Sequence, residues 1–117
     1  MRDFRQYAVW QKAHLLTLAV YSAAASFPSH ELFGLRSQVQ RAAASIGLNI
    51  SEGCGLETDA EFGRFLRIAA GSASELEYGL LLARDLKYLA PERHVELERQ
   101  TQEVKRMLFA LTRSLRS

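Results

Sequence analysis

The sequence predicts an all-α protein, an antiparallel four-helix bundle with up-down-up-down connections. Apolar residues recur every three or four positions along nearly the whole chain, which is the spacing of helices that each bury one face. No stretch alternates apolar and polar residues as a half-buried strand would. Proline or glycine interrupts the helical pattern at three places, and short connections favour antiparallel neighbours.

The first two helices are expected at about 6–26 and 31–53. A proline precedes Ser29, which is expected to cap the second helix because proline disfavours helical geometry in the residue before it and serine accepts backbone hydrogen bonds. The second helix ends in a glycine pair, Gly53 and Gly55. We expect a left-handed cap there, since glycine adopts positive φ without steric penalty.

The third and fourth helices are expected at about 59–89 and 91–116. Thr58 and Glu61 have the spacing of a capping box, in which each side chain bonds the other residue's backbone N–H. Pro91 suits the first turn of the fourth helix, because that position needs no N–H donor.

The composition predicts one domain, residues 1–117, in the cytoplasm. The 15 Lys and Arg residues nearly balance 13 Asp and Glu, so the net charge of +2 is only a weak indication of an anionic partner. The single cysteine excludes an internal disulfide and is compatible with a reducing compartment. No apolar run approaches the roughly 18 residues that a membrane span needs, and no apolar signal core follows the first residues.

Polar residues line one stripe of the second helix and meet a run of small residues in the third. We expect an interhelical network in which Arg41 pairs with Glu75, because unpaired buried polar groups cost about 1–3 kcal/mol each. The alternative is that the stripe binds a ligand near a bundle end. The predicted network comprises Gln38, Arg41, Ser45, Asn49, Glu52, Ser72 and Glu75.

Two glycines inside these helices, Gly47 and Gly71, are expected to let the backbones pack closely. Each costs up to about 1 kcal/mol relative to alanine within a helix, so helix propensity alone does not favour them. The region lacks the lysine and hydroxyl pair of a P-loop, which argues against nucleotide binding by that mechanism.

No residue pattern indicates catalysis, a metal or a cofactor. Helical di-iron sites need a glutamate three residues before a histidine, and His14, His30 and His94 follow glutamine, phenylalanine and proline at that spacing. Cys54 has no histidine near it in sequence and is interpreted as a small residue of the connection between helices. Trp10 is interpreted as a core or interface anchor rather than a base-stacking platform.

Three segments carry a family resemblance: VWQKA, FPSHELFGLRSQVQRAAASIGLNISEGCG and GSASELEYGLLLARDLKYL. They resemble the S23, or 23S rRNA intervening-sequence, proteins, a bacterial four-helix bundle family, in the same order from about Phe4 to Leu115. One departure is Gly47, where proline is expected in many relatives. The resemblance extends to the accessory protein of diversity-generating retroelements, and it implies a homo-oligomer, with a pentamer favoured, that associates with reverse transcriptase and nucleic acid.

Extra apolar residues are consistent with assembly. The first and third helices carry more large apolar side chains than one bundle seam requires. These side chains form either a broad core face or a subunit interface. The candidate interface residues are Leu15, Leu18, Tyr78, Leu82 and Tyr88.

Basic residues of the third and fourth helices are the candidate phosphate contacts. Oligomerisation would multiply such weak contacts. The alternative is that these residues form the solvated outer face of the bundle. The candidates are Arg64, Arg67, Arg84, Lys87, Lys105, Arg106 and Arg113.

These patterns together predict a non-catalytic oligomeric scaffold that binds RNA, DNA or a nucleic-acid enzyme. The alternative is a protein-docking module whose charges only solubilise it. Neither hypothesis involves a membrane, a cofactor or a small-molecule substrate. The two differ in salt dependence, because phosphate binding weakens steeply as salt rises.

Overall fold

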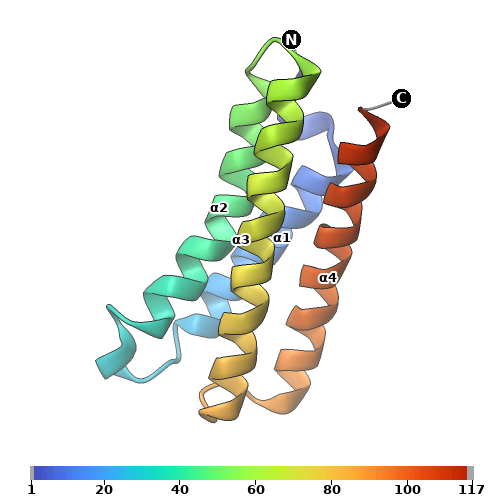
Figure 1. Cartoon of the computed structure of the whole chain (residues 1–117). Helices are drawn as coiled ribbons and strands as arrows, with labels where there is room; N and C mark the ends of the chain where they lie inside the picture. Colours follow the sequence, from blue (N-terminus) through green and yellow to red (C-terminus); the bar gives the residue numbers. More distant parts are fainter. Residues whose placement is uncertain (1, 116–117) are drawn as a thin grey trace.

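The computed structural model describes residues 2–115, which form four long helices in a bundle with extents of 44 × 23 × 19 Å (Figure 1). Residue 116, the last expected helical position, lies outside the described residues. The described part contains no strand. Its elements are η1 (Phe4–Gln6), α1 (Ala8–Ala24), η2 (Ser29–Glu31), α2 (Leu35–Cys54), α3 (Asp59–Asp85) and α4 (Pro91–Ser114).

The helices are arranged so that each packs against its neighbours in the chain, and α4 closes the bundle against α1. Within residues 2–115, the backbones of α1 and α3 do not come close to each other, and these two helices therefore lie on a diagonal. The chain reverses direction at each connection (Figure 1). The α1–α2 and α3–α4 connections meet at one end, where the Tyr88 hydroxyl donates to Glu31 Oε2 at 3.0 Å. Arg2 and the α2–α3 connection lie at the other end.

The start of α3 has the predicted capping box. Thr58 Oγ1 accepts from the Glu61 N–H at 3.1 Å, and Glu61 Oε1 accepts from the Thr58 N–H at 3.4 Å. Pro91 occupies the first turn of α4, also as predicted. The N-termini of α3 and α4 are therefore determined by residues close in the sequence and need no tertiary contact.

The start of α2 differs from the prediction in both position and cap. The chain first makes the short helix η2, and α2 begins only at Leu35. Ser29 does not cap it; instead Glu31 Oε1 accepts from the Leu35 N–H at 2.9 Å. This backbone hydrogen bond, followed by that of Tyr88, lowers the pKa of Glu31 below its ordinary value. Glu31 therefore links the start of α2 to the α3–α4 connection.

The end of α3 is earlier than expected, at Asp85 rather than residue 89. Lys87 adopts φ 67°, a left-handed conformation that usually belongs to glycine. The Tyr88 N–H then donates to the Ala83 carbonyl and the Lys87 N–H to the Arg84 carbonyl, both at 2.9 Å. These are the two hydrogen bonds of a Schellman cap, so the helix ends although no glycine marks the place.

The end of α2 also corrects a prediction. No glycine of the described chain has positive φ, and Gly55 has φ −80°. Gly53 lies inside α2, where a Cβ atom would stand 2.9 Å from Phe65 Cβ. Gly79 of α3 is in a similar position, because its Cβ would stand 2.7 Å from Val39 Cγ1. Glycine at these positions lets α2 and α3 approach closely.

No helix in the described part of the chain is both long and apolar enough to span a membrane.

The core is built from the predicted apolar stripes of all four helices. The largest completely buried side chains include Leu16 of α1, Ile46 and Ile50 of α2, Phe62, Leu66, Leu76 and Leu80 of α3, and Leu97 and Leu108 of α4.

Candidate nucleic-acid interface

The polar residues between α2 and α3 make a small hydrogen-bonded group. Ser45 Oγ and Ser72 Oγ are 2.8 Å apart across the two helices. Asn49 Nδ2 donates to the Ser45 carbonyl at 2.8 Å and to Ser45 Oγ at 2.9 Å. All three residues are half-buried, so the group satisfies atoms that water reaches poorly.

The other four predicted members do not join this group, and the expected pair of Arg41 with Glu75 is wrong. Both side chains line the same groove of about 400 Å³, but no ion pair or side-chain hydrogen bond joins them within residues 2–115. Gln38 and Glu52 also lack such bonds in that range. All four side chains are exposed. Water solvates their charges and dipoles, so no desolvation cost requires them to pair.

The interior glycines Gly47 and Gly71 behave differently from each other. A Cβ at Gly47 would lie 3.4 Å from Trp10 Nε1, so this glycine accommodates the tryptophan. The half-buried Trp10 ring packs against the core and stacks on His14 with centroids 5.0 Å apart. A Cβ at Gly71 would meet nothing within 4 Å. Close packing is therefore the wrong explanation for Gly71, which is exposed.

The predicted loop position of Cys54 is also wrong, because it is the last residue of α2 and is buried. Burial raises the pKa of its thiol, the opposite of what an activated nucleophile requires. His30 contacts the Tyr88 hydroxyl at the other end of the bundle, and His94 is buried in α4. The described residues contain no group of three His, Cys, Asp or Glu side chains arranged to hold a metal ion.

The candidate interface residues separate into two classes. Leu15, Leu18 and Tyr78 have exposed fractions of 61%, 55% and 65%. Leu82 and Tyr88 are half-buried against the core, and the Tyr88 hydroxyl is bonded to Glu31. These two are therefore core residues rather than a free surface. Since α1 and α3 lie on a diagonal, the two leucines and Tyr78 lie on different sides of the bundle.

The basic candidates also separate by their ionic partners. Arg84 pairs with Asp85 at 2.9 Å, and Lys105 pairs with Glu77 at 3.0 Å. Lys87 lies in the α3–α4 connection, at the opposite end from the start of α3. The remaining four have no ion pair within residues 2–115 and are exposed: Arg64, Arg67, Arg106 and Arg113.

These four arginines lie on one surface, which we name the α3–α4 face. Helical spacing aligns its residues in two rows, with steps of three and four. The rows are adjacent, because Glu77 bonds Gln102 and Lys105 across the seam and Arg67 lines a groove with Thr112. The face comprises Arg64, Arg67, Gly71, Ser74 and Tyr78 of α3 with Gln102, Arg106, Phe109 and Arg113 of α4, all exposed.

Sequence reasoning missed Phe109, which is 46% exposed although the next residue toward the N-terminus, Leu108, is buried. A signal was present in its spacing: Phe109 is three residues after Arg106 and four before Arg113. Residues so spaced share a helix face. The helical spacing of an apolar residue from charged residues is thus a better indicator of its exposure than its hydrophobicity is.

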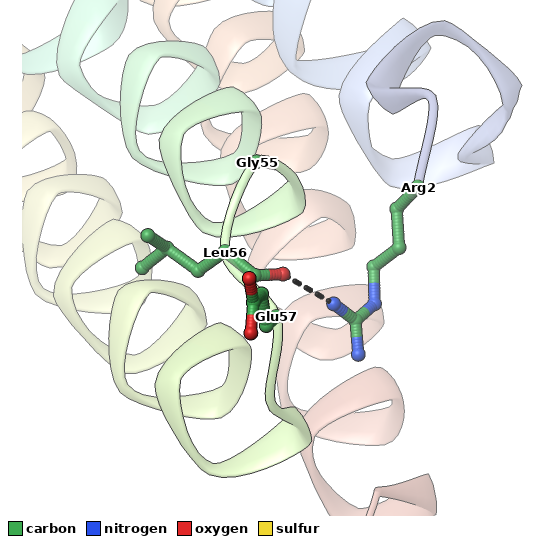
Figure 2. A pocket seen from close by; sticks show the side chains of 4 residues that line it. All are labelled: Arg2, Gly55, Leu56 and Glu57. Atoms are coloured by element: carbon green, nitrogen blue, oxygen red, sulfur yellow. Dashed lines mark hydrogen bonds between the residues drawn. The ribbon is translucent and has the colours of Figure 1, made fainter.

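Arg2 was also missed, and it lines a hollow of about 570 Å³ with Gly55, Leu56 and Glu57 (Figure 2). Its guanidinium donates to the Leu56 carbonyl at 3.1 Å, lies 4.4 Å from the Phe62 ring centroid and pairs with Asp59. Because Asp59 balances its charge, this hollow offers an anion less attraction than the α3–α4 face does.

The fold and this surface define a small antiparallel four-helix bundle protein with one basic face. The chain belongs to the 23S rRNA-intervening sequence protein family, whose model matches residues 5–110. The family predicted from the sequence resemblance is therefore confirmed.

A solved structure supports both the family and the fold. It is a protein of unknown function from the S23 ribosomal protein family of Bacteroides thetaiotaomicron VPI-5482, with 25% sequence identity and a TM-score of 0.81. The match covers 90% of this chain and 98% of that one. No curated protein is detectably similar to the chain.

Proposed function

We propose that this chain is a non-catalytic, self-associating scaffold that binds nucleic acid through phosphate contacts on the α3–α4 face. The observation that carries the proposal is the set of four exposed arginines without ionic partners on two adjacent helices. No acidic residue belongs to either row of the face. Arginine without a neighbouring carboxylate attracts phosphate without first breaking an internal ion pair.

Self-association is proposed through the outer surface of α1. Gln11, Leu15, Leu18 and Ser22 form an exposed row with no charge, unlike the basic α3–α4 face. Because α1 is diagonal to α3, assembly through this row leaves the arginines of α3 accessible. The proposed subunit number, five, rests on the family resemblance alone.

The direct test is fluorescence anisotropy with labelled RNA and DNA across a salt series, with light scattering on the same sample. Binding should weaken along a steep log-log slope as salt rises. Arg106→Glu should weaken binding at low salt and make the slope shallower by about 0.9, because it removes one phosphate contact. Between about 50 and 200 mM salt, its affinity should therefore fall about 3.5-fold less than that of the wild type. The matched control is Arg41→Glu, an exposed arginine of α2 without an ion pair within residues 2–115, which should bind as the wild type does.

The alternative function is protein docking without nucleic-acid binding, favoured by the exposed Leu15 and Leu18. An oligomer that binds no nucleic acid at low salt would support it and overturn the proposed phosphate contacts. Leu18→Glu should reduce the mass measured by light scattering, whereas Val95→Glu, at a residue of α4 that is also more than half exposed, should not. If Leu18→Glu leaves the mass unchanged, the α1 row is not the assembly surface.

A further inference from the structure

The α3–α4 face carries two aromatic side chains among its arginines. Tyr78 is 65% exposed on α3 and Phe109 is 46% exposed on α4. Phe109 is flanked along its own row by Arg106 and Arg113. An exposed aromatic ring is costly to hydrate, and neither ring contributes to the buried core.

The surroundings of Phe109 leave space for a flat ligand. The antiparallel register that pairs Glu77 with Lys105 and aligns Arg67 with Thr112 places Phe109 beside Gly71. A Cβ at Gly71 would meet no atom within 4 Å. No atom therefore covers the outer side of Gly71, which lies between the arginines of both rows.

The charges around the rings favour an anionic chain. Two carboxylates at the seam are already paired. Glu77 is bonded to Lys105 at 3.0 Å and to Gln102 at 3.2 Å, and Asp59, which lines the groove beside Arg67, pairs with Arg2. The Lys105 hydrogen bond holds the pKa of Glu77 below its ordinary value, so it stays paired as a carboxylate. The unpaired charges of the face are then those of the four arginines, which complement phosphate groups.

The width of the face excludes insertion into a DNA major groove. That groove, about 12 Å wide, admits one helix, whereas neighbouring helix axes are separated by about 8–10 Å and each helix is about 10–12 Å across. α3 and α4 together are too wide. Aromatic rings also stack only on bases that are free of a duplex stack.

We infer that the α3–α4 face binds single-stranded nucleic acid, with Tyr78 and Phe109 stacking on unpaired bases and the four arginines contacting phosphates. This inference rests on the proposed function and specifies its ligand. Stacking tolerates any base, so the face should bind without strong sequence preference. Single-stranded RNA and single-stranded DNA share this chemistry. Measuring the binding of each shows which of the two is the ligand.

The experiment measures the fluorescence anisotropy of three labelled probes: a 16-nucleotide oligo(dT), the matching oligo(U) and a 16-base-pair duplex. This length is at the upper end of the binding sites of single domains, which are about 4–16 nucleotides. The wild-type chain should bind one or both single strands more tightly than the duplex. Phe109→Ala should weaken that binding about 5- to 160-fold while leaving the salt slope unchanged. Arg106→Gln should lower the slope, because it removes a phosphate contact.

Two controls separate stacking from loss of fold or of general hydrophobicity. Phe33→Ala removes a ring that is 93% exposed at the opposite end of the bundle, and it should not change binding. Phe109→Trp keeps a stacking surface and should retain single-strand affinity. Circular dichroism melts of each variant verify that the bundle is folded.

The outcomes distinguish the two proposals. Equal binding of duplex and single strands, with Phe109→Ala silent, overturns the stacking inference but leaves phosphate binding intact. No binding of any oligonucleotide at low salt overturns both. A salt-independent loss in Phe109→Ala that Phe109→Trp restores supports single-strand stacking.

Discussion

The two sides of α3 contrast in how they use small residues. Toward α2, Gly79 lies against Val39 and the Ser72 hydroxyl meets Ser45, so small size permits close approach and hydrogen bonding. On the outer side, a Cβ at Gly71 would meet no atom within 4 Å and Ser74 is exposed, and both residues lie between the arginines and Tyr78. The same residue types thus fix helix pairing on one side and leave an open surface on the other.

The largest effect is expected for Gly79→Ala. Its Cβ would lie 2.7 Å from Cγ1 of the buried Val39, a short, stiff side chain without room to move. Overpacking costs about 1–3 kcal/mol, and alanine's helix propensity returns up to about 1 kcal/mol. We expect a net loss of about 1–2 kcal/mol in the free energy of unfolding, measured in urea. Unchanged stability would mean that the helices separate at little cost.

Ser72→Ala tests the hydrogen bond on the α2 side. Losing the bond to Ser45 should cost about 1 kcal/mol, with Asn49 still bonded to Ser45. The matched control is Ser74→Ala, which removes an exposed hydroxyl from the outer side and should be neutral or slightly stabilising. If the two variants melt alike, the hydroxyl pair contributes nothing to helix pairing.

Gly71→Ala should have the opposite sign from Gly79→Ala. The new methyl group meets no atom within 4 Å, so only helix propensity changes. We expect a gain of about 0.5–1 kcal/mol in unfolding free energy, seen as a higher melting temperature. A destabilised variant would contradict the description of the outer side as open.

The smallest effect is expected for Glu77, which joins α3 to α4. The hydrogen bond from Lys105 lowers its folded pKa below the ordinary 4.5. Its contribution is therefore present above the unfolded pKa and is lost as pH falls through the folded pKa. Lowering the pH from 6 to 3 should reduce the free energy of unfolding of Glu77→Gln less than that of the wild type, by a few tenths of a kcal/mol. Urea denaturation at each pH measures the difference. Glu75 forms no ion pair within residues 2–115, so the stability of Glu75→Gln should change with pH as that of the wild type does.

Features set by neighbours in sequence could be predicted, whereas features that depend on helix rotation could not. The capping box of Thr58 and the position of Pro91 follow from local chemistry. The cross-helix distance between Arg41 and Glu75 depends on how α2 and α3 rotate about their axes, which spacing along one helix does not determine. The end of α3 was missed because Lys87 takes a conformation that its sequence does not indicate.

The candidate site shows the same division. Spacing alone places Arg64 and Arg67 on one helix face, and the sequence identified them. The charges of Arg84 and Lys105 are neutralised by nearby carboxylates, and the sequence does not show that these carboxylates come within ion-pair distance. Phe109 was overlooked because a large apolar residue beside Leu108 suggests burial, although its spacing from Arg106 and Arg113 places it on their helix face.

The meeting of Arg2, Asp59 and Leu115 at one end of the bundle has a consequence for chain connectivity. Arg2 pairs with Asp59, which lines a groove with Leu115, so a short flexible linker could join residues 2 and 115. The exposed Phe33 connection at the other end offers a place for new termini. Such a circular permutant would begin with α2 and end with α1, yet keep every helix contact, because the bundle requires adjacency of its helices rather than their order in the gene.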